Sequence, residues 1–372
     1  MAGARPGRRM GRMAIAVSLA GILSIAPLAG LQSVLAGSGS GVVFGWGVDT
    51  LNQRGVPPYV TDAIAISAGA NHGLALNNGG TVYAWGDDTF GQTDVPLDLS
   101  GVIAISAGAS HSLALKADGT VAAWGDDTFG QTDVPLDLSG VRAISAGWHH
   151  SLALLGDGRV AAWGDDTYGQ TDVPADLSNV KAISAGWYHS LALTANGTVV
   201  AWGDDAFGET DVPADLSGVV SISAGADFCL ALKSDGTVVG WGDNRLFQSS
   251  SVPHDLSQVV AISAGANHSL ALKADGTVVA WGSNIKAQTF VPAGLSGVIA
   301  ISAGWDFSLA LGGIRTSQYV AVQAQPEGFF TRELQWVITA ILGVIGLEAL
   351  AWYLVLRRRK PAGADSSPTQ PR

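Results

Sequence analysis

The chain has 372 residues with 49 glycines, a hydrophobic fraction of 47% and a formal net charge of −11 at pH 7. Its basic residues gather near the two ends, so that residues 37–320 contain 27 acidic but only 10 basic side chains. A domain this acidic repels the phosphate backbone, which argues against binding of DNA or RNA. The single cysteine, Cys229, excludes an intramolecular disulfide, so packing alone must hold the fold.

The first 36 residues have the pattern of a signal peptide. Arginines without any acidic residue precede an almost unbroken apolar run over 13–35, which ends at Val34-Leu35-Ala36. Small residues at this point are typical of a signal peptidase site, so we predict a signal peptide over 1–36 with cleavage after Ala36. The apolar run is long for a signal, and an uncleaved N-terminal membrane anchor is the alternative.

Residues 37–322 consist mostly of copies of one repeat. The segment Ile-Ser-Ala-Gly occurs seven times, and its glycines recur every 39 residues, with a single spacing of 40. A Trp-Gly pair also occurs seven times. The first pair precedes the first Ile-Ser-Ala-Gly segment, and one pair lies between each two successive segments. Self-similarity at such a period is typical of a propeller or a solenoid.

Each repeat predicts three antiparallel strands. In the second copy, 103–107 and 112–116 are short runs of Ile, Leu and Ala, and Asp118-Gly119 leads from the second run into 120–124. An Asp-Gly pair between two such runs favours a tight hairpin. Whether residues 131–134 add a short fourth strand to the repeat is left open. Because the runs are apolar at nearly every position, both faces of each small sheet should be covered.

The order of the half-repeats predicts a closed ring. The chain enters the repeats on a Trp-Gly half, 42–47, and leaves them on an Ile-Ser-Ala-Gly half, 299–311. If the two ends meet, they complete a seventh blade and leave no open sheet edge. An open solenoid would need polar capping repeats, which the sequence lacks. We therefore predict an all-β fold, a seven-bladed β-propeller whose last blade is closed by both termini.

A polar stalk (323–333), an apolar segment (334–356) and a polar tail (357–372) follow the repeats. The stretch from Trp336 to Leu356 contains one charged residue and is long enough to span a bilayer as a helix. Four consecutive basic residues, 357–360, follow it at once and mark a cytoplasmic end. The sequence thus predicts a single-pass protein of the cell membrane with an extracellular propeller, a C-terminal transmembrane helix and a cytoplasmic C-terminus.

The recurring letters G-x-x-H-S-L-A-L, D-G-T-V, W-G and G-Q resemble the regulator of chromosome condensation repeat family over about residues 41–311. The second copy contains the whole motif, in Gly108 to Leu115, Trp124-Gly125 and Gly130-Gln131. The resemblance implies a seven-bladed propeller. Nuclear members, which act as nucleotide exchange factors for a small GTPase on chromatin, have longer repeats with inserted loops and a basic tail. The compact acidic unit is more similar to secreted bacterial members, among them an inhibitor of β-lactamases, which implies binding of protein partners on one face of the ring.

Three repeated features have structural explanations. The histidine of the H-S-L-A-L segment is replaced by Phe228 and Phe307 in two copies, which favours a packing role with one hydrogen bond over a metal site. Each Trp-Gly tryptophan is predicted to pack between blades. The acidic loop after it, such as Asp126-Asp127 with Asp133, commonly bonds its own backbone, and calcium binding is left open. The repeated histidines of the H-S-L-A-L segments are His72, His111, His150, His189 and His268.

We predict no cofactor and no metal site.

Two positions directly after each Ile-Ser-Ala-Gly segment change from copy to copy, and we call them the variable pair. Three of the twelve tryptophans lie there, and rigid loops with Trp and Tyr are typical of protein-interface hot spots. The alternative is that these aromatics only cap the ends of the blades. The pairs are Ala70-Asn71, Ala109-Ser110, Trp148-His149, Trp187-Tyr188, Ala226-Asp227, Ala266-Asn267 and Trp305-Asp306. The predicted partner-binding residues are Trp148, His149, Trp187, Tyr188, Asp227, Trp305 and Asp306.

These residues support a non-enzymatic function, a membrane-anchored extracellular scaffold that recognises a protein partner, or a carbohydrate, on its aromatic loops. One alternative is a polysaccharide-active or polysaccharide-binding surface protein that uses Asp227 and Asp306. Catalysis needs an asymmetric cluster of titratable groups, whereas nearly every acid here recurs with the repeat. A second alternative is a structural surface protein that associates with itself.

Overall fold

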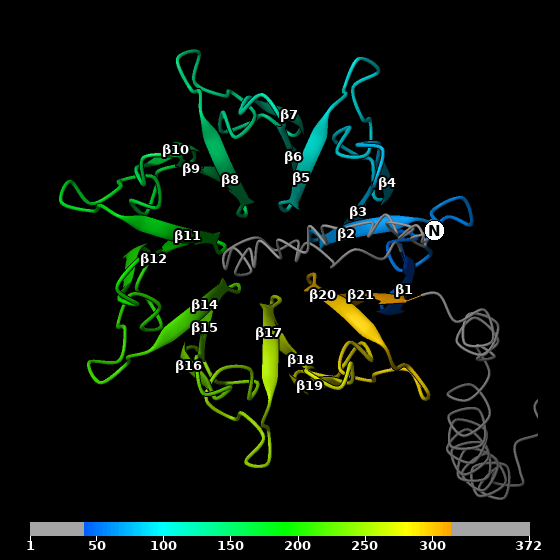
Figure 1. Cartoon of the computed structure of the whole chain (residues 1–372), viewed down its shortest axis with the longest axis vertical. Helices are drawn as coiled ribbons and strands as arrows, with labels where there is room; N and C mark the ends of the chain where they lie inside the picture. Colours follow the sequence, from blue (N-terminus) through cyan, green and yellow to red (C-terminus); the bar gives the residue numbers. More distant parts are fainter. Residues whose placement is uncertain (1–40, 314–372) are drawn as a thin grey trace, which may run out of the picture. The chain divides into compact units, whose positions relative to one another are not determined.

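The computed structural model describes residues 41–313, and the predicted signal peptide, stalk, membrane segment and cytoplasmic tail lie outside these described residues. Among the residues that are described, no helix is both long enough and apolar enough to cross a membrane. Their regular structure is made of strands that form small antiparallel sheets around a ring (Figure 1).

Each blade has three strands, which we call inner, middle and outer by their distance from the ring axis. Five blades are separate three-stranded sheets, and the first and last blades are joined into one six-stranded sheet. The inner strands are β2 (Ala63–Ala68), β5 (Val102–Ala107), β8 (Val141–Ala146), β11 (Val180–Ala185), β14 (Val219–Ala224), β17 (Val259–Ala264) and β20 (Val298–Ala303). The middle strands are β3 (His72–Asn77), β6 (His111–Lys116), β9 (His150–Leu155), β12 (His189–Thr194), β15 (Phe228–Lys233), β18 (His268–Lys273) and β21 (Phe307–Gly313). The outer strands are β4 (Val82–Gly86), β7 (Val121–Gly125), β10 (Val160–Gly164), β13 (Val199–Gly203), β16 (Val238–Gly242), β19 (Val278–Gly282) and β1 (Gly41–Gly47). Residues 131–134 contain no strand, so the fourth strand left open by the sequence does not form.

The last blade is completed by the N-terminal strand, as predicted. Strand β1 pairs with β21 from Gly41↔Gly313 to Gly47↔Phe307 and so takes the outer position beside β20 and β21. A single further pair, Gly41↔Ala63, joins β1 to β2 of the first blade. The ring in Figure 1 is closed at this point by both ends of the repeat array.

One hydrogen bond repeats at all seven junctions between inner strands. The serine of each Ile-Ser-Ala segment accepts a bond from the backbone N–H of the corresponding alanine in the next blade, as Ser67 Oγ does from Ala107 at 2.9 Å. Ser302 of the last blade accepts the same bond from Ala68 of the first blade, also at 2.9 Å. The inner strands of the last and first blades are therefore joined by the same hydrogen bond as those of the other blades. The remaining bonds join Ser106 to Ala146, Ser145 to Ala185, Ser184 to Ala224, Ser223 to Ala264 and Ser263 to Ala303.

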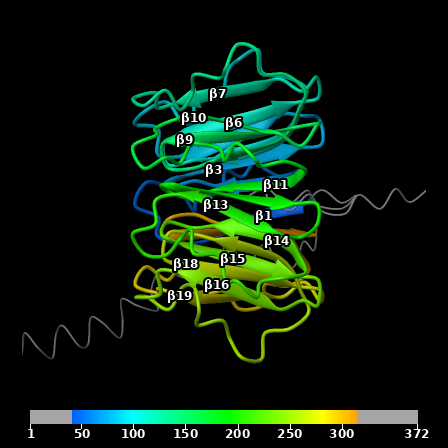
Figure 2. The same cartoon turned by 90° about the vertical axis from the view of Figure 1, so that its left-hand side faces the viewer.

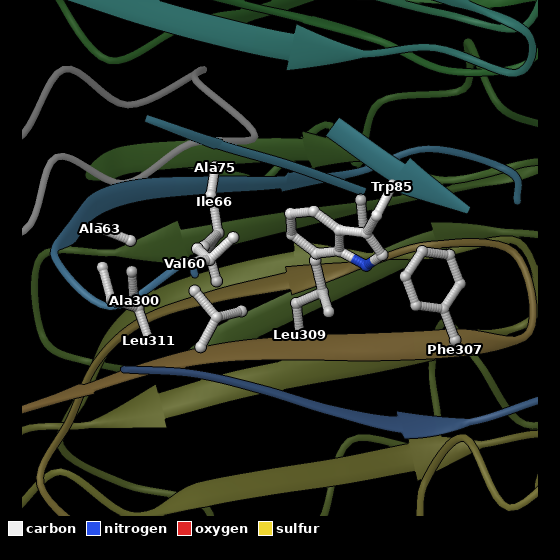
Figure 3. Packing of buried hydrophobic residues seen from close by; sticks show 11 residues of the cluster. Val60, Ala63, Ile66, Ala75, Trp85, Ala300, Phe307, Leu309 and Leu311 are labelled. Carbon is white, nitrogen blue, oxygen red and sulfur yellow. The ribbon is translucent and has the colours of Figure 1, made fainter. Parts of the chain in front are cut away.

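The hydrophobic core lies between blades, and Figure 3 shows it at the closing junction. Trp85 and Ile66 of the first blade pack there with Phe307 and Leu309 of the last. Every Trp-Gly tryptophan is at most 7% exposed. Each also donates its indole N–H to a backbone carbonyl of the preceding loop, as Trp85 does to Gln53 at 2.9 Å. The predicted packing role of these tryptophans is confirmed.

The repeated histidines are buried at the same junctions. His111 Nε2 lies 3.1 Å from the hydroxyl of Ser151 in the next blade, and that hydroxyl donates to the carbonyl of Gln131. Where the repeat has phenylalanine, Phe228 and Phe307 are fully buried and pack in the clusters that contain the next blade's tryptophan. The contacts are those of a packing residue with one hydrogen bond, as the sequence predicts.

Glycine is required in each Ile-Ser-Ala-Gly segment because two groups approach its Cα closely. A Cβ atom on Gly108 would lie 2.4 Å from the ring of His111 and 2.6 Å from the carbonyl oxygen of Gly147. Both distances are too short for real side-chain atoms. The segment therefore turns tightly against its own histidine and against the neighbouring blade.

Candidate functional site: an aromatic arc on the turn face

The turns between inner and middle strands lie on the same side of the ring as the loops that follow the outer strands. Backbone bonds join the two, as in Asp126 N to Ser110 O at 2.8 Å. We call this side the turn face. The hairpins between middle and outer strands form the opposite side, the hairpin face, where Ala117 N bonds to Gly101 O at 2.8 Å. Figure 2 shows the ring from the side, with loops collected at both edges and strands crossing between them.

A ring of backbone bonds supports the variable pairs. The N–H of the first residue of a pair donates to the carbonyl of the Ile-Ser-Ala-Gly glycine in the next blade, as Trp148 does to Gly186 at 3.2 Å. The side chains of the pair therefore project from a backbone held by two blades. The same bond joins Ala70 to Gly108, Ala109 to Gly147, Trp187 to Gly225, Ala226 to Gly265 and Ala266 to Gly304.

Three tryptophans from distant parts of the chain meet at the axis. The ring centroid of Trp148 lies 4.3 Å from that of Trp187 and 5.3 Å from that of Trp305, and the Trp187–Trp305 distance is 5.7 Å. All three line a small pocket at the axis together with Ala and Gly of the inner turns. The alanine at this position in other blades, for example Ala109, is buried, whereas the three tryptophans remain partly exposed.

The second residues of two variable pairs extend this cluster outward. The tilted rings of His149 and Phe129 are in contact with a centroid distance of 4.6 Å, and those of Tyr188 and Tyr168 at 5.0 Å. His149 also contacts Trp148, and Tyr188 contacts Trp187. We call the continuous set the aromatic arc; its members are Phe129, His149, Trp148, Trp187, Tyr188, Tyr168 and Trp305.

Phe129 and Tyr168 belong to a repeated position that the sequence analysis missed. It lies between the acidic pair and the Gly-Gln of each outer loop, and the aromatic side chain is 41–53% exposed in four successive loops. The available signal was an aromatic residue placed in a polar loop, where no strand would bury it. The aromatic residue recurs regularly in these loops, and repeated residues were interpreted as packing residues. The four residues are Phe90, Phe129, Tyr168 and Phe207.

Asp227 and Asp306 are both half-buried on the turn face. Burial raises the pKa of Asp227, with Asp243 adding to the increase and Arg245 opposing it. Burial likewise raises the pKa of Asp306, against the attraction of Lys286. The two carboxylates thus have different neighbours and belong to different blades.

The acidic loops use their carboxylates to hold their own backbone. Asp126 accepts bonds from the Thr128 N–H and hydroxyl and from Gln131 Nε2, and Asp127 accepts from the Thr132 N–H at 2.9 Å. Within residues 41–313 there is no group of three or more His, Cys, Asp or Glu side chains arranged to hold a metal ion. These contacts fix the loops that present the exposed aromatics.

The junction between the blades of β12 and β15 has a buried thiol where the repeat has serine. Cys229 replaces the repeated serine, and its Sγ lies 3.2 Å from His189 Nε2. Burial raises the pKa of the thiol and lowers that of His189 to about 4, so the pair is neutral near pH 7. The loop before this junction contains Glu209 where the other loops have glutamine, and burial raises the pKa of Glu209 to about 6.

Comparison with known proteins agrees with this architecture. Six segments match the family model of the regulator of chromosome condensation (RCC1) repeat: 63–92, 102–131, 141–170, 180–209, 219–248 and 259–288. No curated protein sequence matches the chain significantly.

Solved structures share the fold at low sequence identity. Prp20p of Saccharomyces cerevisiae, whose structure is described together with its binding to Gsp1p and histones, is 20% identical with a TM-score of 0.65, over 76% of this chain and 94% of that one. Human WBSCR16 is 19% identical with a TM-score of 0.59, over 73% and 98%. The CRINKLY WD40 ectodomain of the Arabidopsis thaliana receptor kinase ACR4 is 21% identical with a TM-score of 0.56, over 68% and 93%.

Proposed function

Because this chain belongs to the regulator of chromosome condensation (RCC1) repeat family, we propose that its propeller is a binding scaffold that captures a protein partner on the aromatic arc. The observation that carries the proposal is the meeting of Trp148, Trp187 and Trp305 at the axis, where all three are partly exposed. The backbone N–H groups of Trp148 and Trp187 bond to the next blade. Large aromatic side chains on a rigid base lose little conformational entropy on binding and are the usual centres of protein interfaces. Prp20p is described as binding Gsp1p and histones, so a propeller of this kind serves protein recognition elsewhere.

The proposed place of action is outside the cell, at its membrane. This part rests on the sequence alone: the signal-like residues 1–36, the apolar stretch from Trp336 to Leu356 and the basic residues that follow it. In this arrangement the turn face meets an extracellular partner, and the role is binding without catalysis.

The test compares three forms of the full chain. The first is the natural sequence, the second has Trp148, Trp187 and Trp305 changed to Ala, and the third has three exposed apolar residues outside the turn face, Ile103, Val220 and Val260, changed to Ala. Each is immobilised and exposed to the extracellular proteins of its own source, and retained proteins are identified by mass spectrometry. We expect the natural chain and the third form to retain the same partner.

The tryptophan variant should fold, as judged by circular dichroism, and lose that partner. Retention of the same proteins by all three forms would contradict the proposal. Two further results would favour the alternatives: binding to a polysaccharide array that depends on Asp227 and Asp306, or retention of nothing except the chain itself, with self-association in sedimentation.

A further inference from the structure

Acidic residues are concentrated on the turn face. The inner turns and the outer loops from Trp-Gly to the following Val-Pro contain 17 of the 27 acidic residues between 41 and 313 but only three of the nine basic ones, Arg54, Arg245 and Lys286. Elsewhere in this range there are ten acidic and six basic residues, and hairpin tips pair some of them locally, as Lys233 does with Asp235 at 3.5 Å. The turn face therefore has a strongly negative potential, which favours a positively charged partner.

The negative charge reaches the aromatic arc itself. The pKa of Tyr188 is raised by burial and also by the nearby Tyr168 and by the carboxylates of Asp165, Asp227 and Asp204. The backbone geometry agrees: the Asp204 N–H donates to the Tyr188 carbonyl at 2.8 Å, and the Tyr168 and Tyr188 ring centroids lie 5.0 Å apart. Asp165 belongs to the same loop as Tyr168, and Asp227 belongs to the variable pair of the next blade. A cation placed against the exposed surface of the Tyr168–Tyr188 pair would have both aromatic rings and several carboxylates within reach.

Elsewhere on the turn face, an arginine of the chain already lies between an aromatic ring and a carboxylate. The guanidinium carbon of Arg245 lies 4.1 Å from the ring centroid of Phe207, and its Nε lies 2.9 Å from Asp243 Oδ1. Arg245 stands at the loop position that is threonine in four other repeats, so this contact is a local addition to the repeat. It shows that a ring of the turn face and a neighbouring carboxylate can hold one guanidinium between them.

We propose that the Tyr168–Tyr188 pair, flanked by Asp165, Asp204 and Asp227, binds arginine side chains of a basic segment in the protein partner. The inference rests on the proposed function, because it assigns a chemistry to the partner of the same face. Arginine is favoured over lysine because its planar guanidinium stacks on an aromatic ring while its N–H groups bond to a carboxylate in the same plane. A lysine ammonium gains the charge attraction without the planar fit.

The test uses three labelled seven-residue peptides in which glycine alternates with arginine, with lysine or with citrulline. Binding to the full chain is measured by fluorescence polarisation at low and at moderate salt. We expect the arginine peptide to bind about fivefold or more tightly than the lysine peptide, and the citrulline peptide, which keeps the planar group without the charge, to lose binding. Equal affinities for arginine and lysine would overturn the inference.

Matched variants locate the site. Tyr188→Ala should weaken binding of the arginine peptide about tenfold, whereas Tyr188→Phe should preserve it because the ring remains. Asp227→Asn should weaken it about three- to tenfold, and Asp235→Asn, the same charge change on the hairpin face, should alter it less than twofold. Equal effects of the two aspartate changes would show nonspecific attraction by net charge and overturn the inference.

The experiment is separate from the test of the proposed function. If the natural partner is lost on changing the three tryptophans but the arginine peptide does not bind, the aromatic arc remains the interface and only the arginine assignment fails. If neither result appears, both proposals fail together.

Discussion

Trp163 in the interior and Trp187 on the turn face show how differently two regions of the ring use the same residue. Trp163 is 7% exposed, packs between blades and donates its indole N–H to the Gln131 carbonyl at 3.0 Å, as its counterpart does at every other junction. Trp187 lies at a position where four blades have alanine, and it remains partly exposed. The comparison indicates that interior residues specify the ring, whereas the variable pairs can change without altering the junctions beneath them.

The largest expected effect comes from acid, which acts on the interior. Burial lowers the pKa values of the five repeated histidines to about 3 or 4, below the ordinary 6.5. Because the folded state has the lower pKa, this contribution to stability is fully present above pH 6.5 and is lost as the pH falls towards the folded values. Each histidine accounts for roughly 3 to 5 kcal/mol at about 1.4 kcal/mol per pKa unit. We expect the chain to unfold cooperatively between about pH 6 and 4. Circular dichroism measures this transition.

A matched pair of variants assigns this acid sensitivity to the interior. His111→Phe, which reproduces the residue found in two other blades, should shift the midpoint of acid unfolding to lower pH. His149→Phe, a change on the turn face, should shift it less because His149 is only partly buried. Identical midpoints for both variants and the natural chain would contradict the assignment.

The next effect separates the two tryptophans directly. Trp163→Ala should lower the free energy of unfolding by about 3 to 5 kcal/mol, because it leaves a cavity between blades and removes one of the two side-chain hydrogen bonds to the Gln131 carbonyl. Trp187→Ala should lower it by less than about 2 kcal/mol, since part of the side chain is already in water, while it weakens partner binding. Urea unfolding measures both changes. A greater loss of stability for Trp187→Ala would reverse the proposed division between interior and face.

The smallest effect concerns Glu209, which occupies the position of the repeated glutamine. Its carboxylate accepts a bond from the Phe207 N–H at 2.8 Å, and its folded pKa of about 6 exceeds the ordinary 4.5. A raised pKa makes the folded state less stable as pH rises from about 4.5 to 6, by at most about 2 kcal/mol. Glu209→Gln, the residue of the other loops, should remove this loss and raise the melting temperature at pH 7 but not at pH 4.5. A uniform change at both pH values would contradict this explanation.

Much of the fold was predictable because each copy of the repeat contains the same strand and turn signals. The Asp-Gly hairpin, the apolar strands and the split of one unit between the two ends led to a closed ring, and the pairing of β1 with β21 confirms this. The number of strands per blade was left open. Residues 131–134 look strand-like in isolation, but Gln131 is buried to bond the loop backbone and Asp126, and the following residues turn.

The candidate site was predictable only in part. Variation at an otherwise constant position indicated Trp148, Trp187 and Trp305, but the sequence places Trp305 more than a hundred residues from the other two. Their contact depends on the diameter of the ring at its axis, where opposite blades come within reach of a tryptophan side chain. The contact between the rings of Tyr188 and Tyr168 likewise depends on how an outer loop crosses to the next blade.

The repeat, the strand order within a blade and the closure by both ends can be inferred without coordinates, because each follows from local turn chemistry and from which half-repeats stand at the ends of the array. Which variable side chains meet depends on the closed ring. Ring closure brings blades together across the axis regardless of their separation along the chain, and so joins tryptophans of three blades with tyrosine, histidine and phenylalanine of neighbouring loops into one aromatic arc.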